Sequence, residues 1–168
     1  PLYSSAASDV YKRQQEEEIL IMPGAWNLPF RHTAGRFASR FLRELRDNKK
    51  IFGVRCPECR RVLLPPRPFC ERCFASIHEW VEVGHQGTLE AFTICYVPFL
   101  GLPPPPIATI MVKLDGADAC LSHVLGGVDL SDVDKAKELV KIGMRLEAVW
   151  RDERKGEIGD IQYFRPVA

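Results

Sequence analysis

The chain has 168 residues, which is enough for one ordinary domain or for a small domain joined to a metal-stabilised module. Hydrophobic residues make up 46% of the chain and charged residues 27%, values typical of a soluble globular protein. No apolar run approaches the roughly 18–20 residues that a membrane-spanning helix requires, so we expect no membrane association.

The first fourteen residues do not read as native protein. The run SSAASDVYKRQ, from Ser4 to Gln14, looks like a translated sequencing-library adapter, and Met22 is a plausible native start. We therefore leave residues 1–14 out of the fold prediction as a sequencing or cloning artefact. This stretch carries two basic residues and one acid, so the rest of the chain is neutral, although the whole chain has a net charge of +1.

Residues 15–50 are predicted to form a loose arm followed by an amphipathic helix. The arm contains Pro23, Gly24 and Pro29 and shows no periodicity, whereas Thr33 is a suitable N-cap for a helix that ends near residues 47–48. Apolar residues then recur at helical spacing and basic residues occupy the other face. The apolar positions are Ala34, Phe37, Ala38, Phe41, Leu42 and Leu45, and the basic positions are Arg36, Arg40, Arg43 and Arg46. The apolar stripe either packs on the protein itself or docks on a partner chain, and in the second case the docking residues would be Phe37, Phe41 and Leu45.

Four cysteines in two close pairs follow the helix. Their spacing, C-x2-C-x10-C-x2-C, is that of a tetrahedral metal site built from two knuckles. Two disulfides or four unrelated buried thiols are the alternatives. Nothing indicates an oxidising compartment, because there is no signal peptide and Cys95 and Cys120 stand unpaired in apolar stretches; we expect a cytoplasmic protein. The predicted metal ligands are Cys56, Cys59, Cys70 and Cys73.

A zinc ribbon is predicted over residues 51–76. Short strands at 51–55 and 62–64 lead into and away from the first knuckle, and the prolines of Pro65–Pro68 fix the backbone before the second. Four thiolates fill a tetrahedral shell and leave no position for substrate, so the metal is expected to be a structural Zn²⁺.

Residues 77–168 are predicted to form a small closed barrel of the OB type. Strands are expected at 80–83, 87–97, 107–114, 119–125, 145–150 and 158–164, with a short helix at 132–140 capped by Ser131. The proline run Pro103–Pro106 interrupts the strands. It makes the apolar segment before it either a rigid docking loop or a cover for one end of the barrel. The docking candidates in this segment are Phe99, Leu100 and Leu102.

Charge is distributed unevenly along the chain. Residues 31–72 carry twelve basic and four acidic residues, a net charge of +8, whereas residues 73–168 carry nine basic and fourteen acidic residues, a net charge of −5. This asymmetry indicates either an anionic partner for the basic half or simply a solvated basic helix face.

No catalytic constellation is evident, and we predict no catalytic residue. Ser122 and His123 are adjacent in a predicted strand, which directs their side chains to opposite faces. Cys95 and Cys120 are interpreted as small core residues rather than nucleophiles. There is no Walker loop and no G-x-G-x-x-G motif.

Several motifs of this chain occur together in a known architecture. They are the two cysteine pairs, Leu64–Arg67, Trp80, Gly87–Thr93, the prolines before Ile107, Gly143–Val149 and Tyr163–Pro166. With them, residues 33–168 resemble the acyl-CoA-associated zinc-ribbon and OB-fold family, long catalogued as a domain of unknown function. One departure is that Arg60 and Phe74 stand where related knuckles often place glycine, which makes an iron centre less favoured than zinc.

The resemblance implies a mainly β protein with an N-terminal amphipathic helix, a rubredoxin-like zinc ribbon and a C-terminal OB-fold barrel. It also implies a non-catalytic accessory subunit that supports a thiolase-superfamily enzyme acting on acyl-CoA, either a thiolase or a lipid-transfer-like aldolase. The small subunit of benzoylsuccinyl-CoA thiolase is one example of such a protein. The expected partner is a thiolase-fold catalytic subunit in a hetero-oligomer.

Arginine side chains on the helix and the ribbon suit the phosphates of CoA, because the guanidinium fork matches phosphate oxygens. The candidates are Arg36, Arg40, Arg60, Arg61 and Arg67. The alternative function is binding of single-stranded nucleic acid, in which zinc ribbons and OB folds also occur. The acidic barrel half argues against it, although Phe92 and Tyr96 are spaced to share one strand face as a stacking pair.

Overall fold

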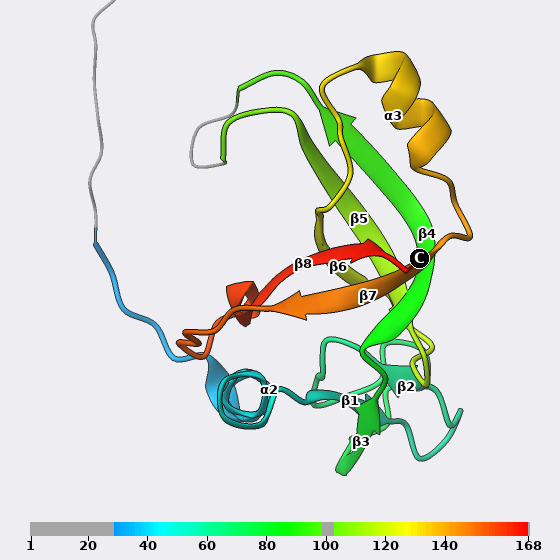
Figure 1. Ribbon diagram of the computed structural model, residues 1–168. Helices are drawn as coiled ribbons and strands as arrows, with labels where there is room; N and C mark the ends of the chain where they lie inside the picture. The colour runs from blue at the N-terminus through cyan, green and yellow to red at the C-terminus, as the bar shows by residue number, and fades with distance from the viewer. Residues whose placement is uncertain (1–28, 99–102, 168) are drawn as a thin grey trace, which may run out of the picture. The chain divides into compact units, whose positions relative to one another are not determined.

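The computed structural model describes residues 29–98 and 103–167 (Figure 1). The chain divides into two units, Pro1–Thr33 and Ala34–Ala168, and the second contains the helices and strands described below. The docking candidates Phe99, Leu100 and Leu102 lie outside the described residues, as do residues 1–14 and most of the predicted arm. Where the structure describes the chain, no helix is long and apolar enough to cross a membrane.

Helix α2 spans Gly35–Asn48, and its apolar face packs on the protein's own core. Phe41 is only 4% exposed and Leu45 is fully buried, so the prediction that these two side chains dock on a partner is wrong. The N-cap is Ala34, without a side-chain capping bond, and not the predicted Thr33. The helix ends as predicted because Lys49 adopts a left-handed conformation (φ 52°). Burial of the apolar stripe turns the arginine face of α2 outward.

The ribbon is a three-stranded sheet in the order β2-β1-β3. Its strands are β1 (Ile51–Arg55), β2 (Val62–Leu63) and β3 (Glu79–Val83). Both neighbours pair antiparallel with β1, so that Val54 lies opposite Leu63 on one side and Trp80 on the other. The residues of β3 fall in the predicted 77–168 domain, yet they complete the ribbon sheet. The predicted domain limits, 15–50, 51–76 and 77–168, remain a prediction.

The C-terminal part is a closed barrel in the order β4-β5-β6-β8-β7. Its first strand, β4, pairs with both β5 and β7, which closes the barrel. Figure 1 shows α3 at the opposite end of β4 from the ribbon. The elements are β4 (Gln86–Cys95), β5 (Ile107–Leu114), β6 (Leu121–Leu125), α3 (Val133–Leu139), β7 (Arg145–Trp150), the 3₁₀ turn η1 (Ile158–Asp160) and β8 (Ile161–Pro166).

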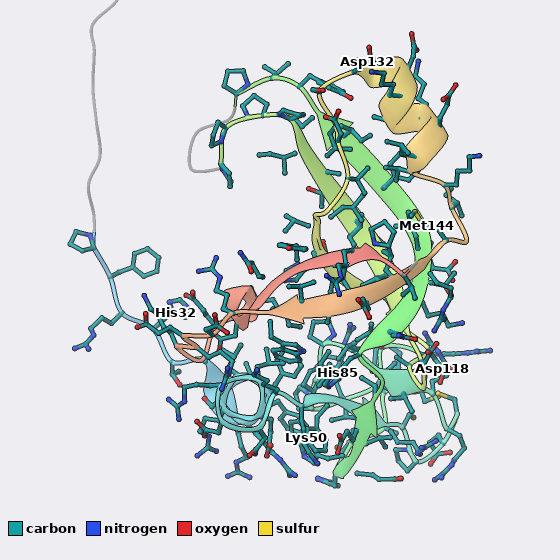
Figure 2. The ribbon with its side chains drawn as sticks, in the orientation of Figure 1. His32, Lys50, His85, Asp118, Asp132 and Met144 are labelled. Atoms are coloured by element: carbon teal, nitrogen blue, oxygen red, sulfur yellow. The ribbon has the colours of Figure 1, made fainter. Side chains whose placement is uncertain are left out.

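Two local predictions in the barrel are corrected. The α3 helix is capped by Asp132, whose carboxylate accepts from the backbone N–H groups of Asp134 and Lys135, and not by Ser131 (Figure 2). The last strand begins at Ile161 rather than residue 158, because η1 precedes it. In that turn the buried carboxylate of Asp160 accepts from the backbone N–H groups of Lys155 and Gly156, each at 2.8 Å, which satisfies two donors of the preceding loop.

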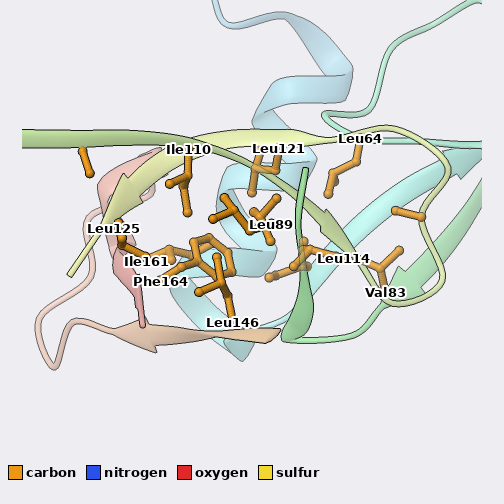
Figure 3. Packing of buried hydrophobic residues seen from close by; sticks show 14 of the residues in the cluster. Leu64, Val83, Leu89, Ile110, Leu114, Leu121, Leu125, Leu146, Ile161 and Phe164 are labelled. Carbon is orange, nitrogen blue, oxygen red and sulfur yellow. The ribbon is translucent and has the colours of Figure 1, made fainter. Parts of the chain in front are cut away.

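Alternating inward residues of the barrel strands form the main core (Figure 3). On β5 every second residue is buried, from Ala108 to Leu114, as a half-buried strand requires. Phe164 of β8 is fully buried among leucine and isoleucine side chains from the facing strands. Each such side chain stabilises the fold by roughly 1.5–3 kcal/mol relative to an exposed position.

The turn between β5 and β6 joins the barrel to the ribbon. The backbone N–H of Asp118 donates to the carbonyl of Val62, and the backbone N–H of Val62 donates to the Asp118 carboxylate, both at 2.8 Å. At the start of the same turn, the Asp115 carbonyl accepts from the Gly84 N–H at 2.8 Å. Figure 2 shows Asp118 at this junction. These backbone bonds fix the ribbon sheet relative to the barrel.

We expect Asp118→Ala to lower the free energy of unfolding by about 1–3 kcal/mol, because the N–H of the buried Val62 would lose its acceptor. Asp118→Asn is the matched control, since its amide oxygen can still accept the bond and should cost less. Urea unfolding followed by circular dichroism measures both. Equal stability of the alanine variant and the native chain would contradict this role for the junction.

Candidate metal centre and basic pocket

The four predicted cysteines converge on one point of the ribbon. Their sulfur atoms all lie within 4.8 Å of one another, and the Sγ atoms of Cys59 and Cys70 are 3.8 Å apart. Cys56 and Cys70 are buried and the other two are half-buried. All six cysteines of the chain are free thiols, so the disulfide alternative does not apply. Four converging sulfurs are the ligand set of a closed tetrahedral Zn²⁺ site.

The two knuckles have the same backbone geometry. In the first, the N–H of Arg60 donates to the carbonyl of Cys56 at 3.1 Å; in the second, the N–H of Phe74 donates to the carbonyl of Cys70 at 2.9 Å. Arg60 (φ 61°) and Phe74 (φ 55°) adopt the left-handed conformation that glycine takes most easily. The knuckles therefore keep the turn that the motif requires, although neither has glycine at this position.

The thiols influence one another strongly. Backbone N–H groups of Cys73 and Arg72 that face the sulfur lower the pKa of Cys70 to about 7. The hydrogen bond of the Cys73 thiol with Cys59, together with burial and negative charge on the neighbouring sulfurs, raises the pKa of Cys73 to about 12. A divalent cation removes this conflict, since its charge stabilises four thiolates together. The donor set therefore fits a structural metal ion.

Three of the predicted phosphate-binding arginines form ion pairs with carboxylates of the chain itself. The guanidinium groups of Arg61 and Arg67 lie 3.3 and 3.4 Å from the carboxylate of Glu71, and that of Arg60 lies 3.6 Å from Glu79. These pairs are largely exposed and contribute little to stability. They reduce the positive charge that this side of the ribbon can offer to an anion.

A basic pocket of about 390 Å³ lies between α2 and the ribbon. Three arginines of the helix line it together with Trp80 of β3 and residues of the segment after the second knuckle. The predicted residues Arg36 and Arg40 both line it, whereas Arg60 and Arg61 do not. A neighbouring pocket of about 310 Å³ is lined by Arg36 and Arg67. The lining residues of the basic pocket are Arg36, Phe37, Arg40, Arg43, Pro68, Ser76, Ile77, His78 and Trp80.

Aromatic rings form one wall of the basic pocket. The rings of Phe37 and Trp80 are stacked, with centroids 5.4 Å apart and an interplanar angle of 21°. The Arg40 guanidinium lies 4.4 Å above the Trp80 ring in a cation–π contact. This contact holds Arg40 in place, and its N–H donors can still face an anion. Phe37 is half-buried in this stack, and its docking on a partner stays a prediction.

Sequence reasoning did not place Trp80 or His78 at this site. Trp80 comes next to Arg40 only because β3 pairs with β1, on which α2 packs. The spacing of residues along the chain carries no signal for such a pairing. The sole hint was that Trp80 belongs to the set of motifs shared with the family.

The remaining candidates occupy structural positions. His123 faces inward, hydrogen-bonded through Nε2 to the Ile158 carbonyl at 3.3 Å, while Ser122 is exposed on the outer face. The Cys95 thiol donates to the carbonyl of Val97 at 3.3 Å. Phe92 packs against the main core, and Tyr96 lies beyond the end of β4.

Comparison with known proteins identifies both parts of the chain. Residues 43–79 match the family domain described as the ChsH2 rubredoxin-like zinc ribbon, and residues 80–151 match the ChsH2 C-terminal OB-fold domain. The predicted fold class and the structural zinc are thereby confirmed.

One curated relative and two solved structures are similar over most of the chain. A DUF35 domain-containing scaffold protein of Methanocaldococcus jannaschii is 29% identical over 136 residues, which cover 76% of this chain and 89% of the relative. The structure titled Ltp2-ChsH2(DUF35) aldolase has a TM-score of 0.58 and 20% identity, with 82% of this chain and 100% of that chain covered. A DUF35 family protein from Sulfolobus solfataricus, described as of unknown function, has a TM-score of 0.52 and 22% identity, with 76% and 81% covered. The two structures share the fold of this chain.

Removal of zinc is expected to unfold the ribbon. Structural zinc sites contribute roughly 10–16 kcal/mol of binding free energy at neutral pH, more than a core as small as that of the ribbon can replace. The cluster of four cysteines would bind one ion, so Cys56→Ser should lower the zinc content from about one ion per chain toward zero. Zinc content is measured with a colorimetric chelator and unfolding by circular dichroism. Cys95→Ser is the control, and equal zinc loss in both variants would contradict the assignment.

Stability is expected to fall on mild acidification through His123. Burial lowers the pKa of His123, and its Nδ1 atom is buried without a hydrogen-bond partner. The unfolded chain therefore binds a proton more readily, so stability is highest above the unfolded pKa of about 6.5 and decreases as the pH falls toward the folded pKa.

Urea unfolding at about pH 7.5 and about pH 5.5 measures this effect in the native chain and in His123→Gln. The other histidines are present in both proteins, so their contributions cancel. The loss of stability between the two pH values should be smaller in the glutamine variant. An identical loss in both proteins would show that His123 is not responsible.

Proposed function

The chain belongs to the ChsH2 zinc-ribbon and OB-fold family, and from this premise we propose that it is a non-catalytic accessory subunit of an enzyme that acts on acyl-CoA. The observation that carries the proposal is the family membership of both domains. The similar solved structure is titled an aldolase formed by Ltp2 with a ChsH2 DUF35 chain, and the curated relative is named a scaffold protein. Both names describe chains that work together with other proteins.

We further propose that the partner is a thiolase-superfamily catalytic subunit, either a thiolase or a lipid-transfer-like aldolase, in a cytoplasmic hetero-oligomer. The chemistry of this chain agrees with a non-catalytic role. The four-sulfur cluster has no open position for a substrate. In the part of the chain that the structure describes, no histidine is hydrogen-bonded to a serine, a cysteine or a carboxylate. The reacting groups would then come from the partner.

The basic pocket suits the phosphate end of CoA. CoA carries a diphosphate and a 3′-phosphate, and arginine forks bind phosphate oxygens through paired N–H donors. Arg36 and Arg40 supply such donors, and the Phe37–Trp80 stack supplies an apolar wall for a base or ribose. Arg67, in the neighbouring pocket, could bind a second phosphate if Glu71 released it.

Binding of single-stranded nucleic acid has less support from the structure. A groove for it requires a basic surface with exposed aromatic rings. Residues 73–168 carry a net charge of −5, and the proposed stacking pair does not form, because Phe92 packs against the core.

We expect this chain alone to have no thiolase or aldolase activity and to form a stable complex with a thiolase-fold subunit encoded beside its gene. In that complex the Arg36→Ala and Arg40→Ala variants should each bind CoA about tenfold more weakly, because a charge-assisted hydrogen bond contributes about 1.5–3 kcal/mol. Isothermal titration calorimetry with CoA measures this loss.

Two controls make the result specific. Lys141→Ala removes an exposed positive charge outside the basic pocket and should leave CoA affinity unchanged. Pantetheine, which lacks the phosphates, should bind the native and variant complexes equally. Failure to bind any adjacent thiolase-fold subunit, or tight binding of oligonucleotides that weakens steeply with salt, would overturn the proposal.

A further inference from the structure

Two phenylalanines on the ribbon are exposed without a role in the fold. Phe74, directly after the second cysteine pair, is 80% exposed, and Phe69, directly before the pair, is 50% exposed. A phenylalanine at such positions gains little from the hydrophobic effect within its own chain. We call Phe69 and Phe74 the ribbon phenylalanines.

Phe74 also occupies an unfavourable backbone conformation. Its φ of 55° is in the left-handed region, where a side chain with a Cβ atom is disfavoured and glycine is not. The equivalent residue of the first knuckle, Arg60, has nearly the same φ (61°) but pairs with Glu79 of its own chain. Phe74 has no comparable compensation, because its ring lies in solvent. Strain kept at an exposed aromatic residue points to a function outside the folded chain.

The ribbon phenylalanines belong to the two segments that line one part of the basic pocket. Phe69 forms a β-bridge with Ser76, and the backbone N–H of Ile77 donates to the carbonyl of Pro68 at 2.9 Å. Pro68, Ser76 and Ile77 all line the pocket. The two rings are therefore attached to the segments that form one side of its wall.

We propose that Phe69 and Phe74 are aromatic anchors that fill an apolar pocket on the catalytic subunit, beside the entrance to its active site. This inference rests on the proposed function. If the basic pocket holds the phosphates of CoA, the pantetheine arm must cross to the partner, so the partner must contact the rim of the pocket. Aromatic residues, phenylalanine among them, are enriched at protein interfaces, and a few fully desolvated residues carry most of the binding energy there.

Charge selects this occupant over a second copy of the chain. Arg72 lies between the ribbon phenylalanines in sequence and is exposed, whereas Glu71 is already paired with Arg61 and Arg67. A symmetric contact between two copies would bring the two Arg72 side chains toward each other, and like charges oppose such a contact. A partner with acidic residues around an apolar pocket fits both features.

Phe74→Gly tests the proposal, because it should affect folding and binding in opposite directions. Glycine relieves the left-handed strain and removes little buried area, so the zinc-loaded variant should be at least as stable as the native chain. Its affinity for the catalytic subunit, measured by titration calorimetry, should fall about tenfold or more. Phe69→Ser should weaken the complex in the same way.

Arg60→Gly is the matched control. It makes the same backbone change in the first knuckle but leaves both rings in place, so it should bind the catalytic subunit as the native chain does. Zinc content and sedimentation equilibrium are measured for every variant.

If Phe74→Gly and Phe69→Ser both bind the catalytic subunit with native affinity, this inference is overturned but the proposed function is not. Faster release of zinc to a chelator by Phe74→Gly, with normal binding of the catalytic subunit, would also overturn the inference. Loss of self-association of the free chain in the same variant would overturn it too. No binding by the native chain would overturn the proposed function as well.

Discussion

The convergence of four sulfurs in the ribbon is the constraint on which the basic side of the molecule depends. Apart from cysteines, the cluster next to the knuckles buries only Val54, Leu63 and Ile77, too few to hold the two knuckles together. A metal ion bound by the four thiolates fixes both knuckles at once. The position of β1 then determines where β3 and α2 can pack. The zinc site therefore positions the elements of the basic side, while its filled ligand shell leaves no position for a substrate.

Two separate forms of packing bring the arginines of α2 to the aromatic wall. Burial of Phe41 and Leu45 in the main core fixes the rotation of the helix and turns its basic face outward. The register of β3 on β1 then sets Trp80 beneath Arg40, where the cation–π contact holds the guanidinium. Neither feature alone would form the basic pocket, which needs both the helix and the metal-stabilised sheet.

The barrel and the ribbon carry net charges of opposite sign. The ribbon and helix concentrate positive charge around a pocket and a thiolate cluster, whereas the barrel is acidic and joined to them by backbone hydrogen bonds at Asp115 and Asp118. Under the proposed function, the chain holds an anionic cofactor for a partner, and a basic surface on a rigid support suits that role. The barrel supplies rigidity, because its closed sheet leaves its own strands paired.

Local patterns in the sequence determined the metal ligands, the helix over Gly35–Asn48 and most strands, including β5 and β7 with their observed bounds. Cysteine spacing and hydrophobic periodicity are properties of neighbouring residues, so they can be read without a fold. Tertiary structure alone decided that Phe41 and Leu45 are covered by the chain itself, that β3 joins the ribbon, and that Trp80 meets Arg40. These outcomes depend on which distant segments pack together, and the packing energy that selects them is not encoded in the spacing of any single segment.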